Sequence, residues 1–267
     1  MKMVSAAKLK KAQDAITAMR PYSDKLTELL QSLSATLEGD SGSRFAENRE
    51  VKKVLVVVIS SNRGLAGAFN SNIVKEAKNI ADNHYTNKEV HFLTIGKKAN
   101  DIVKKTHTVI QNENAIYDDL SFENAEVIAE KVMDLFVNGE YDKVELVYNK
   151  FKNAATQEVT REQFLPIVPL KQQNPDAKAP TLDYIFEPSK ETIVKELIPK
   201  ALKTQFFKGI RDSVASEHGA RMTAMHKATD NAKELRDQLK LTYNKARQAA
   251  ITNEILEIVG GAEALNN

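Results

Sequence analysis

The pair Gly64 and Gly67 is the first place in this sequence where residue type and spacing could support chemistry. The two glycines follow an apolar, β-branched run at 54–59 that predicts a buried strand, and they precede a segment that predicts a helix. A strand-to-helix turn at this position binds phosphate when its backbone N–H groups point at the ligand. The spacing is G-x-x-G, which matches neither G-x-G-x-x-G nor a turn ending in Gly-Lys-Ser/Thr. We therefore interpret the segment as a structural turn, and an anion or partner contact stays open as the alternative.

The remaining candidates for catalysis or metal binding have structural explanations. His218 and His226 lie eight positions apart on one predicted helix, so they cannot bind one metal ion in the i, i+4 manner. Asp118 and Asp119 shortly precede a predicted helix at 122–138, where acidic side chains stabilise the first turn. The chain has no Gly-x-Ser-x-Gly turn, and its lack of Cys excludes thiolate zinc sites and a Cys nucleophile. The sequence predicts no catalytic residues, no metal site and no cofactor.

Composition narrows the class of protein further. The 267 residues carry 38 Lys or Arg against 36 Asp or Glu, so the net charge of +2 gives no general attraction to nucleic acid or membranes. No apolar run approaches the ~20 residues of a transmembrane helix. We expect a soluble protein of ~1–2 domains in a reducing compartment.

A very long helix is the dominant predicted element. From 200 to 259 there is no Pro, and only Gly209 and Gly219 interrupt good helix formers. Sixty helical residues span ~90 Å, whereas a compact globule of this mass is roughly 45–50 Å across, so we expect the helix to protrude. Apolar or small residues recur on it every three or four positions, the pattern of a helix packed along another helix. They are Met222, Met225, Ala228, Ala232, Leu235, Leu239, Tyr243, Ala246 and Ala250.

The N-terminal segment offers a packing partner for this helix. It repeats the same spacing and ends at the Gly- and Ser-rich segment 39–43, with apolar residues at Tyr22, Leu26, Leu29, Leu33 and Leu37. The two ends of the chain therefore predict one antiparallel helical pair with the middle inserted between them.

The middle of the chain alternates predicted strands and helices. The strands are expected at 54–59, 90–95, 107–111, 144–148 and near 156–168, and the helices at about 70–85, 97–105 and 122–138. This alternation is typical of a small α/β domain with a parallel sheet. We expect three regions: an N-terminal coiled-coil helix at 1–40, an α/β domain with a Pro-rich connector at 50–188, and a long C-terminal coiled-coil helix at 189–267.

Two features of the long helix indicate a partner. Residues 200–250 hold eleven Lys or Arg against five Asp or Glu, which fits a solvated face, nucleic acid or an acidic protein channel. Few aromatic residues are interleaved to stack on bases, which argues against nucleic acid. The helix tip is apolar and would be an exposed patch unless another protein covers it. Its apolar residues are Ile251, Ile255, Leu256, Ile258 and Val259.

Long segments of the chain closely resemble the gamma subunit of F-type ATP synthases. The C-terminal helix carries the most specific motifs, Ala-Arg-Met-Thr-Ala-Met-His-Lys-Ala-Thr-Asp-Asn-Ala at 220–232 and Leu-Thr-Tyr-Asn-Lys-Ala-Arg-Gln-Ala-Ala-Ile-Thr at 241–252. Met-Lys-Met-Val-Ser-Ala-Ala-Lys-Leu at 1–9 and the turn at 61–67 resemble the family's N-terminal helix and central-domain turn. The resemblance covers the whole chain in the right order.

The resemblance implies a rotor shaft, the central stalk of the synthase. Its fold would be α/β plus long helices: an antiparallel coiled coil of the N- and C-terminal helices with an inserted Rossmann-like parallel-sheet domain. In the family the apolar tip turns inside a hexamer of three alpha and three beta subunits, while the lower end stands on the membrane c-ring and holds the epsilon subunit. Proton flow turns ring and shaft, and the asymmetric shaft drives the beta-subunit catalytic sites through their nucleotide states.

The same resemblance implies what the chain lacks and where it works. It would have no catalytic site and no cofactor of its own, and it would bind no nucleic acid. It would be peripheral, held through the complex on the cytoplasmic face of the bacterial inner membrane, with the mitochondrial matrix side as the second choice.

The resemblance also assigns roles to individual residues. The interface with the alpha and beta subunits would contain Met3, Arg221, Arg247, Gln248, Ile251, Ile255 and Val259. Arg247 and Gln248 resemble the polar pair that hydrogen-bonds the beta-subunit catch loop. The foot that faces the c-ring and epsilon would be Tyr184, Ile185, Phe186 and Glu187.

Two departures from the family pattern stand out. Family members carry about twenty more residues before Met-Lys-Met-Val, so we expect the sequence to start inside the first helix of the coiled coil. The plastid form has an inserted pair of regulatory cysteines, whereas this chain has none, which favours a bacterial or mitochondrial-type enzyme.

Two other classes of function remain as alternatives. The first is an α/β nucleotide-dependent enzyme whose terminal helices dimerise it, which the Gly64–Gly67 spacing does not favour. The second is a coiled-coil scaffold or nucleic-acid-binding arm, which would show steeply salt-dependent binding.

Overall fold

The computed structural model describes residues 2–34, 43–167 and 190–265, which fall into two compact units, Met1–Thr223 and Ala224–Asn267. The helices in chain order are α1 (Lys2–Ser34), α2 (Ser43–Ala46), α3 (Phe69–Asn79), α4 (Lys97–Val103), α5 (Phe122–Val137) and α6 (Lys190–Leu265). The strands are β1 (Lys53–Ile59), β2 (Glu89–Ile95), β3 (Val109–Asn112), β4 (Lys143–Phe151) and β5 (Gln157–Leu165). A π-helical turn (Ile80–His84) and a 3-10 turn (Ala115–Tyr117) complete the series.

The strands of the first unit form one sheet in the order β3-β2-β1-β4-β5. β1 pairs in parallel with β2 and β4, and β2 pairs in parallel with β3. β5 pairs antiparallel to β4 because only a short turn separates the two strands, whereas parallel neighbours need a long crossover connection.

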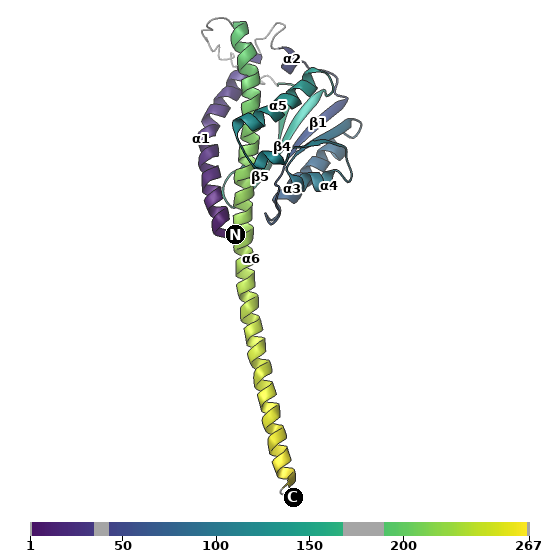
Figure 1. Ribbon diagram of the computed structural model, residues 1–267. Helices are drawn as coiled ribbons and strands as arrows, with labels where there is room; N and C mark the ends of the chain where they lie inside the picture. Colours follow the sequence, from purple (N-terminus) through teal and green to yellow (C-terminus); the bar gives the residue numbers. More distant parts are fainter. Residues whose placement is uncertain (1, 35–42, 168–189, 266–267) are drawn as a thin grey trace, which may run out of the picture. The chain divides into compact units, whose positions relative to one another are not determined.

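The apolar run in β1 serves both faces of the sheet. Leu55, Val57 and Ile59 belong to a core that includes buried residues of α5 and α6, while Val54, Val56 and Val58 pack with α3 and α4. Figure 1 shows these helices around the sheet. A strand covered on both faces needs apolar residues at every position, which explains the unbroken run at 54–59.

Helix α1 packs against the part of α6 that belongs to the first unit. Leu9, Ala12 and Ile16 share an apolar cluster with Phe151 and Ala215. Further along α1, Leu26 joins the main core, which also contains Ile198, Leu202, Phe206 and Ile210 of α6. The N- and C-terminal helices thus pair as expected.

The second unit consists of the continuation of α6 from Ala224. Most of its described side chains are exposed, including large apolar ones. The exposed apolar residues are Leu235, Leu239, Leu241, Tyr243, Ile251, Ile255, Leu256, Ile258 and Val259.

The expected fold class is confirmed: long terminal helices and an inserted α/β domain. Two details differ. The expected parallel sheet is present in β1 to β4, whereas the last strand, expected near 156–168, pairs antiparallel at the edge as β5. The apolar face of α6 was expected to be buried along 222–250. The buried apolar residues of α6 lie instead in the stretch from Ile198 to Ala215, whereas Leu235, Leu239 and Tyr243 are exposed. The expected end of the first helix falls on 39–43, of which 39–42 lie outside the described residues, as does most of the Pro-rich connector.

Candidate functional site

A cleft in the first unit brings together four segments that are distant in sequence. It has a volume of about 590 Å³ and is lined by the start of α1, the turn after β1, the segment around Tyr117 and the outer end of this unit's part of α6. Its lining residues are Val4, Ser5, Lys8, Asn62, Arg63, Gly64, Leu65, Tyr117, Asp118, Leu120, Val214, Glu217, His218 and Arg221. Arg221 and the 61–67 turn, both singled out from the sequence, therefore meet here.

Arg221 is held inside the first unit by two sets of contacts. Its Nη1 lies 2.7 Å from Oε1 of Glu217, one helical turn earlier. Its Nη2 also donates to the carbonyl oxygens of Arg63 (3.2 Å) and Gly64 (3.4 Å). These contacts hold α6 against the turn. Only 12% of the Arg221 side chain is exposed, so little of its surface is available to a partner.

The turn after β1 is itself fixed by side-chain hydrogen bonds. Asn62 donates to the carbonyl of Asn114 and accepts from the backbone N–H of Lys97. Leu65 (φ 62°) and Gly67 (φ 57°) adopt left-handed backbone conformations, and Leu65 remains 63% exposed. The turn thus holds an apolar side chain outward and offers carbonyl oxygens to Arg221, whereas a phosphate cradle offers N–H groups.

Burial dominates the electrostatics of the cleft. It raises the pKa of Glu217, and this effect outweighs the ion pair with Arg221. Burial, together with the positive charges of Arg221 and Lys8, lowers the pKa of His218 to about 4. His218 is therefore neutral at physiological pH.

The other interface residues expected from the sequence are not among those that line this cleft. Met3, near the start of α1, is 84% exposed, and it does not line the cleft although its neighbour Val4 does. Arg247, Gln248, Ile251, Ile255 and Val259 all lie in the second unit and are exposed. Tyr184, Ile185, Phe186 and Glu187 fall outside the described residues.

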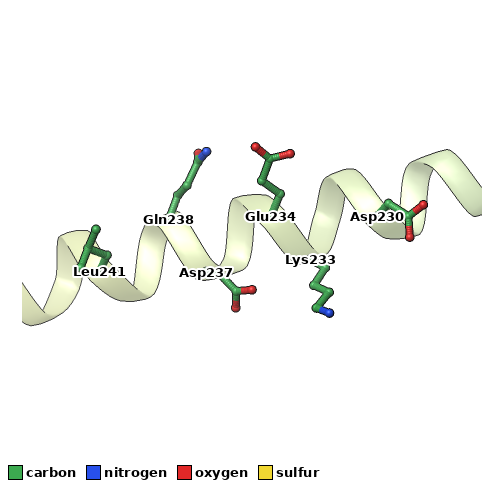
Figure 2. Close-up of a pocket in the computed structure, with 6 residues that line it drawn as sticks. All are labelled: Asp230, Lys233, Glu234, Asp237, Gln238 and Leu241. Carbon is green, nitrogen blue, oxygen red and sulfur yellow. The ribbon is translucent and has the colours of Figure 1, made fainter.

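The second unit also carries a charged surface on a single helix. Figure 2 shows Glu234 and Gln238 extending from one side of the helix and Lys233 and Asp237 from the opposite side. Arg236 bonds to the neighbouring Asp237 at 2.8 Å. Such exposed ion pairs contribute little to stability.

Neither a metal centre nor a membrane span is visible in the described residues. No group of three or more His, Cys, Asp or Glu in ranges 2–34, 43–167 and 190–265 is arranged to hold a metal ion. No helix in the same part of the chain is long and apolar enough to cross a membrane.

The sequence analysis did not predict the ion pair that joins α1 to α6. Arg20 of α1 and Asp212 of α6 form an ion pair at 2.7 Å although 192 positions separate them. Each residue sits in a stretch of ordinary helical composition, so no spacing signalled the pair.

Comparison with known proteins gives one consistent family. The family model described as ATP synthase matches residues 1–265. The chain is 70% identical to the ATP synthase gamma chain of Flavobacterium psychrophilum, covering 99% of this chain and 91% of that relative. It is 45% identical to the ATP synthase gamma chain of Geotalea uraniireducens, with 99% and 91% covered.

Solved structures agree with this fold. The chain resembles one from the central stalk and c-ring of the Tetrahymena thermophila mitochondrial ATP synthase, with 25% identity and a TM-score of 0.62 over 86% of this chain and 97% of that one. A chain from the Euglena gracilis mitochondrial ATP synthase has the same TM-score at 22% identity, over 99% of this chain and 94% of that one, and supports the fold alone. Because the family match spans nearly the whole sequence, the chain belongs to the ATP synthase gamma chain family.

Proposed function

We propose that this chain is the central-stalk rotor shaft of an F-type ATP synthase. It couples rotation of the membrane c-ring, driven by proton flow, to ATP synthesis or hydrolysis at the beta-subunit catalytic sites. The observation that carries the proposal is the 70% identity to an ATP synthase gamma chain over 99% of this sequence. The chemistry belongs to the beta subunits, and this chain transmits movement.

The apolar tip of α6 fits a position inside a ring of alpha and beta subunits. Ile251, Ile255 and Val259 are 48%, 54% and 55% exposed, so a large apolar area is available for burial by a partner. Residues 251–265 contain three Asp or Glu and no Lys or Arg. Apolar contacts are non-directional. A tip that is held mainly by such contacts can therefore rotate, because no hydrogen bonds have to break as its angle changes.

The segment before the tip supplies directional contacts. Residues 224–250 hold six Lys or Arg against three Asp or Glu. Within it, Arg247 and Gln248 are exposed and can donate hydrogen bonds to acidic or carbonyl groups of a beta subunit. Because these bonds require one orientation, they favour particular angles of the shaft, which is what rotational coupling needs.

The remaining contacts follow from the same assembly. Met3, 84% exposed, meets the moving part of the beta subunits, and Arg221 reaches this interface indirectly by holding the 61–67 turn. Tyr184, Ile185, Phe186 and Glu187 form the foot against the c-ring and the epsilon subunit. The chain is then membrane-associated only through the complex, on the cytoplasmic face of the bacterial inner membrane.

Co-purification tests the assembly. The chain is co-expressed untagged with tagged alpha and beta subunits from the same source, and the complex is weighed by native mass spectrometry. We expect one copy per three alpha and three beta subunits, with ATPase activity above that of the chain alone. If the chain does not associate with the alpha and beta subunits, the proposal is wrong.

A double substitution tests the polar contacts. Replacing Arg247 and Gln248 by Ala should leave the fold intact, because both side chains are exposed, and should reduce ATP synthesis in energised membrane vesicles. Lys227→Ala with Asn231→Ala, also exposed on α6, is the matched control and should have a smaller effect. Equal synthesis rates for the two double variants would refute the assigned contact.

A further inference from the structure

Helix α6 is joined to the α/β domain by hydrogen bonds to main-chain carbonyl oxygens of two strands and of the turn between β4 and β5. Three hydroxyl groups take part, spaced along α6 between 213 and 223. Ser213 Oγ donates to Ile59 O (3.4 Å), Ser216 Oγ to Asn149 O (2.8 Å) and Thr223 Oγ1 to Ala154 O (3.2 Å). These bonds fix both the height and the rotation of α6 against the sheet, because two acceptors belong to β1 and β4 and the third belongs to the turn that joins β4 to β5.

An ion pair between the half-buried Arg20 and the fully buried Asp212 extends this arrangement to α1. Nη2 of Arg20 donates to Oδ1 of Asp212 at 2.7 Å and to the carbonyl oxygen of Phe151 at 2.6 Å. The backbone N–H of Phe151 donates to the same Asp212 oxygen at 3.3 Å. The side chain of Asp212 is 0% exposed, so α1, α6 and the end of β4 meet at one buried carboxylate.

Close packing restricts the same face of α6. A Cβ added to Gly219 would lie 3.0 Å from Ala154 O and 3.3 Å from Ala154 Cα. The turn between β4 and β5 therefore lies directly on the helix, and a larger residue at this position would push it away.

These contacts are better suited to fixing the position of α6 along and around the sheet than to raising the free energy of unfolding. A buried ion pair costs desolvation that its attraction barely repays. Arg20 Nε and Asp212 Oδ2 are buried without a hydrogen-bond partner among the described residues, so the penalty is only partly recovered. The apolar core of Ile198, Leu202 and Phe206 supplies stability but tolerates small rotations, because apolar contacts have no preferred direction.

We propose that Arg20, Asp212, Ser216, Gly219 and Thr223, here called the polar joint, form the torsional lock between the helical pair and the α/β domain. The inference rests on the proposed rotor function, since a shaft that passes torque through this domain must not turn within it. Rotating α6 by one residue, about 100°, would break every bond of the polar joint at once. The polar joint residues are positioning residues, because they act by holding α6 against the α/β domain.

The test measures torsional stiffness in the assembled complex. Because the chain contains no Cys, Lys75→Cys on the exposed side of α3 gives one attachment point for a bead. The alpha and beta subunits are fixed to a surface, and a non-hydrolysable ATP analogue stops rotation. The bead's angular variance then reports how rigidly the α/β domain is fixed to the shaft.

Two sets of variants separate torsional stiffness from stability. Ser216→Ala with Thr223→Val removes two hydroxyl bonds, and Arg20→Met with Asp212→Leu replaces the ion pair by apolar residues of similar size. Thr229→Val with Thr242→Val is the control, because those hydroxyls bond only to carbonyls of their own helix, at 2.8 and 3.0 Å. We expect at least about twofold larger variance in both sets, with melting temperatures within a few degrees of the parent chain.

The outcomes distinguish the lock from the rotor function. Unchanged variance in the Ser216/Thr223 variant would overturn the polar joint, whether or not the Arg20/Asp212 variant folds. A variance that rises equally in the control would overturn it too. Failure of the Lys75→Cys parent to assemble or rotate would instead contradict the proposed function.

Discussion

His218 shows how a single side chain reports the packing of α6. Its lowered pKa, about 4, means that the folded protein resists its protonation, whereas the unfolded chain protonates it near the usual 6.5. The unfolded state therefore binds more protons between these values, so stability is fully present above about pH 6.5 and falls as pH drops toward 4. Glu217 acts in the opposite sense, because its raised pKa favours the folded state below its unfolded value, and that contribution is lost as pH rises.

His218→Gln should flatten the acid side of the stability profile. The expected difference from the parent between pH 6.5 and 4 is on the order of 1–2 kcal/mol, since partial exposure screens the effect. Urea unfolding at several pH values measures it, with the exposed His84→Gln as the control. Parallel profiles for the parent and His218→Gln would contradict the described environment.

Gly96 is a second residue with a specific structural requirement. Its φ is +102°, and an added Cβ would lie 2.5 Å from Ser60 O, where β1 ends. We expect Gly96→Ala to lower the free energy of unfolding by about 2–4 kcal/mol. Gly64→Ala, whose added Cβ meets only Lys98 Cε at 3.8 Å, is the comparison. Chemical denaturation measures the free energy of unfolding of both variants. Similar decreases for Gly96→Ala and Gly64→Ala would show that the backbone at Gly96 has no special requirement for glycine.

At the scale of elements, α6 changes character along its length. Leu202 is completely buried in the core, while Leu235, on the same helix, is 56% exposed. Leu202→Ala should cost about 2–5 kcal/mol, and Leu235→Ala less than about 0.5 kcal/mol, in the free energy of unfolding of the isolated chain. Thermal melts of both variants test this, and a large loss from Leu235→Ala would show that its side chain is buried in solution.

Local sequence pattern accounts for most of the elements but not for their pairing. The run at 54–59 predicts β1 because a strand covered on both faces is apolar throughout, and the helix at 122–138 follows from its periodicity. The antiparallel direction of β5 was not predicted, although the short connection excludes a parallel pairing once β4 and β5 are known to be neighbours. The sequence did not show that the buried part of α6 begins near Ile198. Apolar residues recur every three or four positions on both the buried and the exposed parts of this helix, so the spacing does not distinguish them.

The candidate site shows the same division. Arg221 was identified by resemblance, but its contacts with the carbonyls of Arg63 and Gly64 depend on tertiary packing. The ion pair between Arg20 and Asp212 left no trace in sequence, because its members are 192 positions apart. Contacts with other subunits are beyond any single chain, so Met3, Arg247 and Gln248 remain predictions.

At the scale of the whole molecule, the chain is built to transmit torque. Its first unit supplies a rigid α/β body whose joint to α6 is polar and directional, and its second unit supplies exposed apolar and basic surface for partners. The near balance of 38 basic and 36 acidic residues hides a local separation, since residues 251–265 are apolar and acidic while 224–250 are basic.

Direct observation of rotation tests this account most sharply. A bead is attached through Lys75→Cys, the alpha and beta subunits are fixed to a surface, and ATP is added while the bead is followed by video microscopy. The account predicts continuous rotation in one direction that stops when ATP is withdrawn. A bead that shows only random angular motion while the same complexes hydrolyse ATP would contradict it.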